Sequence, residues 1–190
     1  MRGLNLHALR VCLGRKRLLV VFGVLTLASQ AIILSILRDL GLLQFARAQT
    51  TFSKATYLTL AHQWESAQLL PQYQLHFYFD FLHPIWYSCL LAGFIAKGLD
   101  RRGISDRWSW LLLMPFLAGL MDLVENCFHV RFIADLGAIT QPMITMSALA
   151  SNLKWGLFGL SLALTFWLWG GRRQHARGGN GASHADPVNP

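Results

Sequence analysis

The sequence predicts an all-α fold: an integral membrane bundle of four transmembrane helices, with an amphipathic helix in the first outer loop. Hydrophobic residues make up 54% of the 190 residues and charged residues only 14%, a balance more apolar than that of soluble domains. The apolar residues fall in four runs, and each is near the roughly 20 residues that an α-helix needs to cross a bilayer. Lysine and arginine residues lie beside these runs, as is typical of membrane spans.

The charge and the cysteines indicate no other class of protein. The formal net charge is +8, but the basic residues flank apolar runs, where they act as orientation signals and lipid-headgroup contacts. No nucleic-acid partner is therefore expected. The three cysteines are an odd number and widely spaced, so they predict neither a disulfide framework nor a zinc motif.

Residues 1–17 form a basic segment, and residues 18–37 the first predicted span. A signal peptide is the alternative, since Ala46-Arg47-Ala48 resembles a cleavage site. The apolar core of a signal peptide usually has about 7–15 residues, fewer than this run, and Arg38 and Asp39 separate the run from the site. We therefore expect an uncleaved first span.

Three further runs complete the predicted transmembrane domain, residues 18–169. They are residues 74–96, 108–128 and 143–169. The last run is long enough to tilt. From residue 170 to 190, Gly, Arg, His, Asn and Pro dominate, a composition that predicts a disordered cytoplasmic tail.

The basic flanks predict how the chain crosses the membrane. Lys and Arg gather in residues 1–17, 97–107 and 172–177, and they are sparser in the two intervening loops. Positive flanks stay in the cytoplasm, so we expect a multi-pass protein of the cell (inner) membrane with both termini cytoplasmic.

The first outer loop is longer than a simple connection needs. Tyr57, Leu60, Ala61 and Trp64 recur in it at helical spacing, which predicts an amphipathic helix on the outer surface that roofs the bundle. It would act as a lid that guides a ligand or as an ordinary connecting helix.

Polar residues form stripes on three predicted spans. Residues that follow one another at intervals of three or four positions lie on one face of an α-helix. The second span carries His76, Asp80, His83 and Tyr87; the third carries Asp122, Glu125, Asn126 and His129; the fourth carries Ser151, Asn152 and Lys154.

These stripes are predicted to meet at one depth. A rise of about 1.5 Å per residue places Asp80, His83, Asp122, Glu125 and Lys154 roughly 20–26 Å above the cytoplasmic ends of their spans, in the outer half of the bilayer. A charged group costs about 2.5–3.5 kcal/mol near the bilayer centre, so Lys154 is expected to contact Asp122 or Glu125.

Two further expectations concern Pro84 and the histidines His76 and His129. Pro84 cannot donate a hydrogen bond to the Asp80 carbonyl, so we expect a kink that opens backbone at the site. His76 and His129 lie near the outer boundary, where solvated residues are favoured over ligands.

The candidate roles follow from these residue types. Paired acids, histidines and a lysine suit proton transfer. The candidate catalytic residues are Asp80, His83, Asp122, Glu125 and Lys154, and the candidate substrate-binding residues are Tyr87, Asn126, His76 and Asn152. No cofactor or metal is assigned; a metal held by His83, Asp80 and Glu125 is the minor alternative, because an H-E-x-x-H motif is absent.

The runs Tyr78-Phe79-Asp80-Phe81-Leu82-His83-Pro84, Met121-Asp122-Leu123-Val124-Glu125-Asn126 and Lys154-Trp155 resemble a small family of uncharacterised bacterial four-span membrane proteins. The D-x-x-E-N element on the third span carries most of this resemblance, which implies no activity. In general layout the chain also looks like the emopamil-binding sterol isomerases, and this analogy implies only a helical bundle with buried acids and histidines.

Three functions fit the sequence. The first is an intramembrane protein that binds or acts on a lipid-like molecule by acid-base chemistry. The second is a small proton-coupled transporter or channel subunit, although four helices are few for alternating access. The third is a non-catalytic assembly protein held by a structural ion pair. The expected partners of the chain are the lipid bilayer and a lipid-like ligand. The sequence leaves open whether the chain forms a homo-oligomer.

Overall fold

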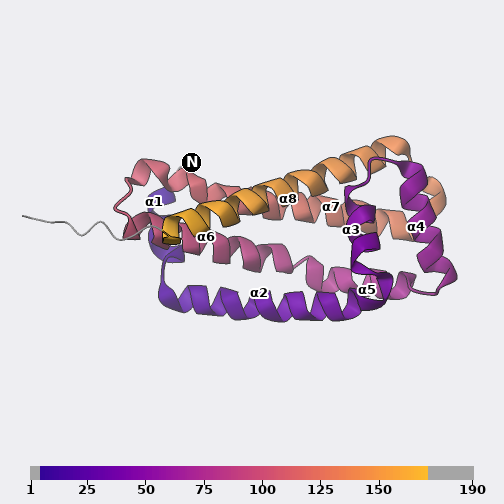
Figure 1. Ribbon diagram of the computed structural model, residues 1–190, viewed down its shortest axis with the longest axis horizontal. Helices are drawn as coiled ribbons and strands as arrows, with labels where there is room; N and C mark the ends of the chain where they lie inside the picture. Colours follow the sequence, from indigo (N-terminus) through magenta and orange to yellow (C-terminus); the bar gives the residue numbers. More distant parts are fainter. Residues whose placement is uncertain (1–4, 171–190) are drawn as a thin grey trace, which may run out of the picture.

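The chain folds into helices that lie side by side along one long axis (Figure 1). The computed structural model describes residues 5–170, and all secondary structure in that range is helical. The elements are α1 (Leu6–Leu13), α2 (Lys16–Leu37), η1 (Arg38–Leu40), α3 (Leu42–Thr50), α4 (Lys54–Ser66), α5 (Leu70–Asp80), α6 (His83–Arg101), η2 (Asp106–Leu112), α7 (Leu113–Ala134), η3 (Leu136–Ala138) and α8 (Gln141–Gly170). The predicted all-α class is confirmed.

Four long rods make up the body of the molecule: α2, the pair α5 and α6, α7, and α8 (Figure 1). They alternate in direction along the chain. The shorter helices α3 and α4 run across one end of the rods, and both ends of the described chain lie at the other. The predicted tail, residues 170–190, falls almost wholly outside the described residues.

Two helical segments, Lys16–Leu40 and Asp106–Ala134, are long and apolar enough to cross a membrane. The pair α5 and α6 passes the same criteria together and would be a third, bent by 42°. The 30-residue helix α8 is not among them. By length and composition, residues 5–170 thus hold two or three candidate spans, so the predicted number of four is not confirmed.

The second predicted span is broken, not kinked. Residues 74–96 were expected to form one helix, but α5 ends at Asp80 and α6 begins at His83. Pro84 lies in the first turn of α6, where its missing N–H needs no partner and its fixed φ suits a helix start. The bounds of α2 and α8 differ from the predicted spans by no more than two residues. The α-helix in the third predicted span begins at Leu113 and not at residue 108, because residues 106–112 form the 3-10 helix η2.

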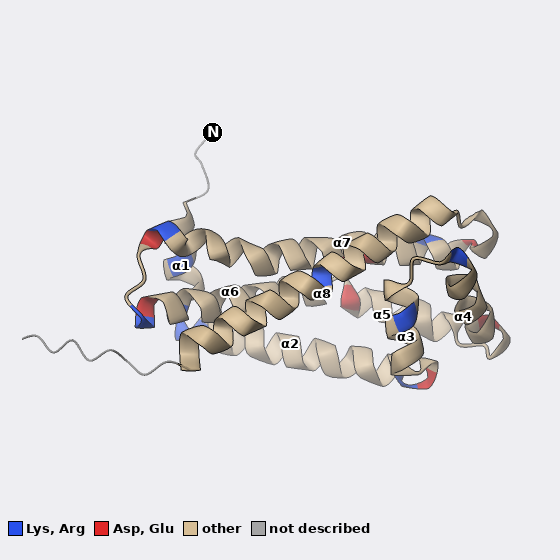
Figure 2. Cartoon of the chain, turned by 45° about the horizontal axis from the view of Figure 1, so that its top comes forward, with Lys and Arg blue, Asp and Glu red and all other residues tan. Residues whose placement is uncertain are grey.

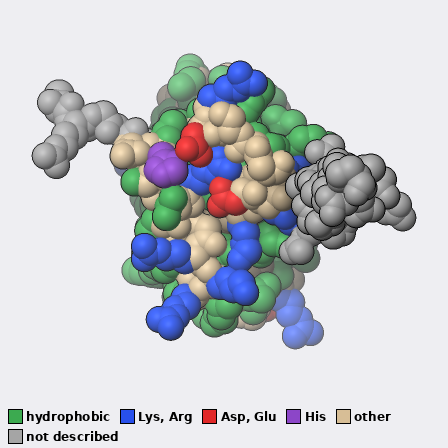
Figure 3. Space-filling model, turned by 90° about the vertical axis from the view of Figure 1, so that its left-hand side faces the viewer, with side chains coloured by type: hydrophobic (Ala, Val, Ile, Leu, Met, Phe, Trp, Pro, Cys, Tyr) green, Lys and Arg blue, Asp and Glu red, His purple; other side chains and the backbone are tan. Residues whose placement is uncertain are grey.

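Basic side chains gather at the end of the molecule shown in Figure 3. Arg10, in the basic segment of residues 1–17 that was expected to contact lipid headgroups, has protein partners instead. It lies on α1 and is only 4% exposed. Its guanidinium donates to Asp100 Oδ1 at 2.7 Å and to the Ile104 carbonyl at 2.9 Å, and it lies 3.2 Å from Asp106 Oδ1. Arg10 therefore ties α1 to the connection between α6 and α7.

The opposite end is covered by α3 and α4. The predicted amphipathic helix is present as α4, and its apolar residues Tyr57, Leu60, Ala61 and Trp64 are all buried. The indole N–H of Trp64 donates to the Leu40 carbonyl at 3.2 Å. The helix α3 beside it was not predicted.

Helices α6 and α8 approach closely at Gly98. A Cβ atom there would lie 2.7 Å from the Leu168 Cβ, a contact that only backbone movement relieves. We expect Gly98→Val to destabilise the fold by about 1–3 kcal/mol, in the range of overpacking. Thermal unfolding of the detergent-solubilised protein by circular dichroism measures this.

The matched control is Gly156→Val on α8, where an added Cβ meets open space. This variant should unfold near the wild-type temperature. Equal unfolding temperatures for the two variants would contradict the proposed close packing of α6 against α8.

Candidate functional site

A cavity of about 250 Å³ lies among the long helices, near the end covered by α3 and α4. Five residues predicted for the site line it: Asp80, His83, Tyr87, Asp122 and Lys154. The remaining lining residues are Gln30, Ile33, Phe45, Gln49, Trp155 and Phe158. The cavity thus joins an acidic and basic wall to an apolar one.

Lys154 is the centre of the charged wall. Its ammonium donates a hydrogen bond to Asp122 Oδ1 at 3.0 Å and lies 2.6 Å from Glu125 Oε2. The Tyr87 hydroxyl donates to the other oxygen of Asp122 at 3.2 Å. All four residues are buried. The predicted contact of Lys154 with Asp122 or Glu125 is present with both acids, and Figure 2 shows this charged group apart from the charged ends of the bundle.

The Asp80 carbonyl at the break between α5 and α6 lacks an intrahelical partner, because the residue four positions later is Pro84, which has no N–H to donate. The side-chain amide of Asn126 on α7 donates to this oxygen at 3.2 Å. Because a buried carbonyl without a donor is costly, Asn126 stabilises the break. The predicted opening of backbone at the site is therefore present, and Asn126 fills it.

Asp80 and His83 are held less firmly than Asp122. The carboxylate of Asp80 lies 3.8 Å from His76 Nε2, beyond hydrogen-bond distance. His83 Nδ1 pairs with the Ser29 hydroxyl on α2 at 2.7 Å, a hydrogen bond between two helices. Its second ring nitrogen has no partner among the described residues. These two side chains therefore offer a free acid and a free imidazole nitrogen to the cavity.

Behind this wall, His129 joins a second buried group. Its Nδ1 lies 2.6 Å from the Tyr73 hydroxyl and 3.4 Å from that of Tyr57, and its Nε2 lies 3.9 Å from Glu125 Oε1. Burial raises the pKa of Tyr57 well above its usual range, so the phenol stays protonated and acts as a donor.

The prediction that His76 and His129 are solvated boundary residues is wrong. His76 is 0% exposed and His129 1%. His76 bonds to the Tyr73 carbonyl through Nδ1 and stacks on the Tyr73 ring. The reason is the cover of α3 and α4, which places protein where a bare helix end would meet water.

Four predicted residues do not line the cavity. Glu125, Asn126 and His76 lie behind it, and Asn152 is exposed. The Asn152 amide donates to the carbonyls of Ala148 and Thr50, at 2.7 and 3.3 Å, so it ties α8 to the end of α3. Gln49 and Phe45 were missed, because nothing in the sequence marked α3 as a helix next to the site.

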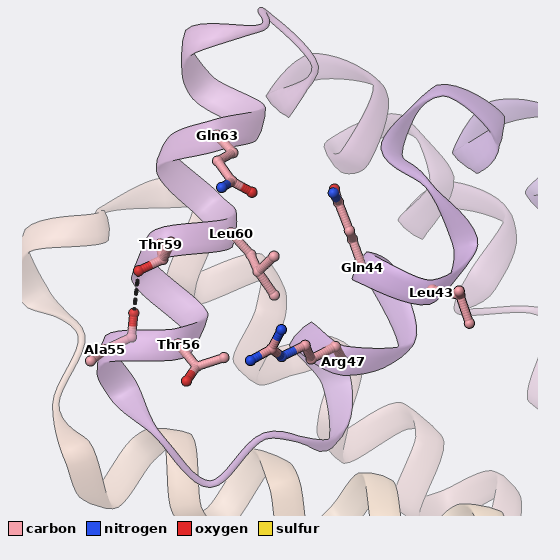
Figure 4. A pocket seen from close by; sticks show the side chains of 8 residues that line it. All are labelled: Leu43, Gln44, Arg47, Ala55, Thr56, Thr59, Leu60 and Gln63. Carbon is pink, nitrogen blue, oxygen red and sulfur yellow. Dashed lines mark hydrogen bonds between the residues drawn. The ribbon is translucent and has the colours of Figure 1, made fainter.

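A second hollow opens between α3 and α4 (Figure 4). It is larger, about 500 Å³, and contains none of the predicted site residues. Arg47 is its one charged lining residue, beside Gln44 and Gln63. Its residues include no acid and no histidine, so the chemistry of this protein is better sought in the central cavity.

Within residues 5–170, no three or more His, Cys, Asp and Glu side chains are arranged to hold a metal ion. Comparison of the chain with models of protein families, with curated proteins and with solved structures gives no match.

Lys154 should carry much of the stability of this region. Lys154→Met leaves Asp122 and Glu125 as neighbouring buried acids, and loss of one partner of a buried ion pair costs about 3–5 kcal/mol. We expect a large drop in the unfolding temperature in detergent, and recovery of much of it when Asp122→Asn and Glu125→Gln are added.

Lys16→Met is the matched control, since Lys16 is exposed at the start of α2. An unfolding temperature for Lys154→Met equal to that of this control would show that the buried pair contributes nothing.

Proposed function

We propose that the chain is a four-span protein of the cell membrane with both termini in the cytoplasm. The alternating rods bring the described ends to one end of the bundle, where basic residues gather (Figures 1 and 3). Helix α8 has 30 residues, about 45 Å at 1.5 Å per residue, more than the hydrocarbon core requires. Its one lysine is neutralised within the bundle, which lowers the cost of placing α8 in lipid.

We propose further that the central cavity binds a lipid-like molecule and acts on it by acid-base chemistry. One observation carries this proposal. In a cavity within an apolar bundle, Asp80 lies 3.8 Å from its nearest cationic partner, His76, and His83 keeps one ring nitrogen without a partner among the described residues, whereas Asp122 and Glu125 contact Lys154 directly. Ligand sites typically combine apolar walls with a few polar groups that fix orientation. Ile33, Phe45 and Phe158 provide the apolar walls.

In this mechanism Asp80 and His83 exchange a proton with the ligand. An imidazole with one nitrogen fixed by a hydroxyl has its other nitrogen oriented for proton transfer, and the acid next to it can take or return the proton. Lys154 with Asp122 supplies a fixed charge pair that stabilises charge as it develops. Tyr87 positions Asp122.

The packing disfavours transport. Between the cavity and the basic end the bundle is filled by a cluster of buried apolar residues: Leu13, Ala92, Ile95, Ala96, Leu99, Leu112 and Leu168. A transport path needs polar or water-filled lining on both sides of its binding site. A binding or catalytic role with access from one half of the membrane therefore suits the described residues better.

We expect Asp80→Asn and His83→Gln to bind the native ligand weakly without loss of fold. Lipid extracts of the protein purified in mild detergent, analysed by mass spectrometry, should contain an enriched amphiphile that is depleted about fivefold or more, roughly 1 kcal/mol, from both variants. Asp39→Asn and His62→Gln, at exposed positions, are the matched controls.

Acid-base chemistry predicts one more result. Incubation of that amphiphile with the wild-type protein in D₂O should place deuterium on carbon, because the C–H bond breaks to a protein base and a deuteron returns. Retention without deuterium incorporation would support binding alone, and equal retention by all variants would refute the proposal.

A further inference from the structure

The cavity lies between two long helices that hardly touch. Helix α2 packs on α5 and α6, and α8 packs on α3, α4, α6 and α7, but α2 and α8 have no extensive contact with each other in the described chain. Both nevertheless line the cavity, α2 through Gln30 and Ile33 and α8 through Trp155 and Phe158. Trp155 is 51% exposed, so the cavity wall reaches the outer surface of the bundle here.

The surface around this side of the cavity is apolar. Leu27 and Leu34 on α2 are exposed, and they lie three residues before and four after the cavity-lining Gln30, on the same side of the helix. Trp155 is exposed on α8. In the proposed membrane orientation these residues contact acyl chains. A path from the cavity through this side leads into the bilayer and not into water.

The cavity is too small for a whole lipid. Its volume is about 250 Å³, whereas pockets that enclose drug-sized ligands have about 300–1,000 Å³. It can therefore hold only one end of a lipid. Since the polar groups line the cavity and the apolar residues surround its outer side, that end must be the polar one.

The charges select the type of polar end. Asp80, Asp122 and Glu125 face a single ammonium group, that of Lys154, which already contacts two of them. The lining contains no arginine. A phosphate or carboxylate head would meet the carboxylate of Asp80, which Lys154 does not contact, at low dielectric and would be repelled. A hydroxyl end can donate a hydrogen bond to the Asp80 carboxylate and accept one from a protonated side chain in the cavity wall.

We infer that the cavity opens sideways between α2 and α8 and takes the uncharged, hydroxyl-bearing end of a single-chain amphiphile whose chain stays in the bilayer. This inference rests on the proposed function and adds the direction of access and the ligand class.

The test uses a hexadecanol that carries a photoreactive diazirine, added to the full-length protein in phosphatidylcholine vesicles. After illumination and digestion, mass spectrometry should place adducts on Ile33, Trp155 or Phe158. Unlabelled hexadecanol should suppress these adducts at a concentration about tenfold lower than hexadecyl phosphate, a difference of roughly 1.4 kcal/mol.

A pair of variants on α2 tests the route. Ile33→Trp fills the side of the cavity and should reduce the adducts at least to one fifth, about 1 kcal/mol. Ile32→Trp makes the same replacement at the neighbouring position, which is 38% exposed and lies on another face of α2, and it should leave them unchanged. If Ile33→Trp does not fold, Phe158→Trp with the exposed control Leu160→Trp answers the same question.

The outcomes separate the two proposals. Adducts confined to α3 and α4 that Asp80→Asn abolishes would overturn side access but support the proposed function. Adducts spread evenly over the bundle, or unaffected by Ile33→Trp and Phe158→Trp, would overturn the inference, as would equal competition by hexadecyl phosphate. Adducts that Asp80→Asn does not reduce would count against both.

Discussion

The structure depends on neutralising charge inside an apolar bundle, and Lys154 does this for α7 and α8. Its ammonium contacts Asp122 and Glu125, which lie three residues apart on one face of α7. A shift of either helix by one residue would part the lysine from both acids and leave buried ions unpaired. The pair therefore sets the register in which α8 packs, and with it the positions of Trp155 and Phe158 in the cavity wall.

A second constraint is the backbone at the break between α5 and α6. Irregular backbone at membrane depth is tolerated only where protein or a cavity surrounds it. Here Asn126 satisfies the Asp80 carbonyl, and α3 and α4 cover the end of the bundle. The break in turn separates Asp80 from the regular helix and places it beside His83 at the cavity. The cover by α3 and α4, the break between α5 and α6 and the position of Asp80 at the cavity thus depend on one another.

The lengths of the apolar runs were enough to predict the helical class and the bounds of α2 and α8. Helical spacing predicted the buried face of α4, and the rise per residue predicted that Asp80, Asp122 and Lys154 come together. The missing features depend on tertiary contacts. A proline allows either a kink or a break, and the donor that favours the break, Asn126, comes from another helix. The burial of His76 and His129 depends on where α3 and α4 fold back, and the partners of Arg10 lie about ninety residues along the chain. No local pattern encodes such contacts.

The two halves of the bundle differ in a way that bears on function. Toward the basic end, small residues such as Gly93 and Gly98 let helices pack in direct contact around apolar side chains. Toward the other end, acids, histidines and tyrosines surround a cavity. Within that half, Lys154 satisfies Asp122 and Glu125, whereas Asp80 and one nitrogen of His83 have no strong partner. Asp80 and the second ring nitrogen of His83 belong to residues that line the central cavity. A ligand in that cavity could supply the hydrogen-bond partners that these two groups lack, whereas the ion pair of Lys154 needs no ligand, and this distinguishes the proposed site from a structural ion pair.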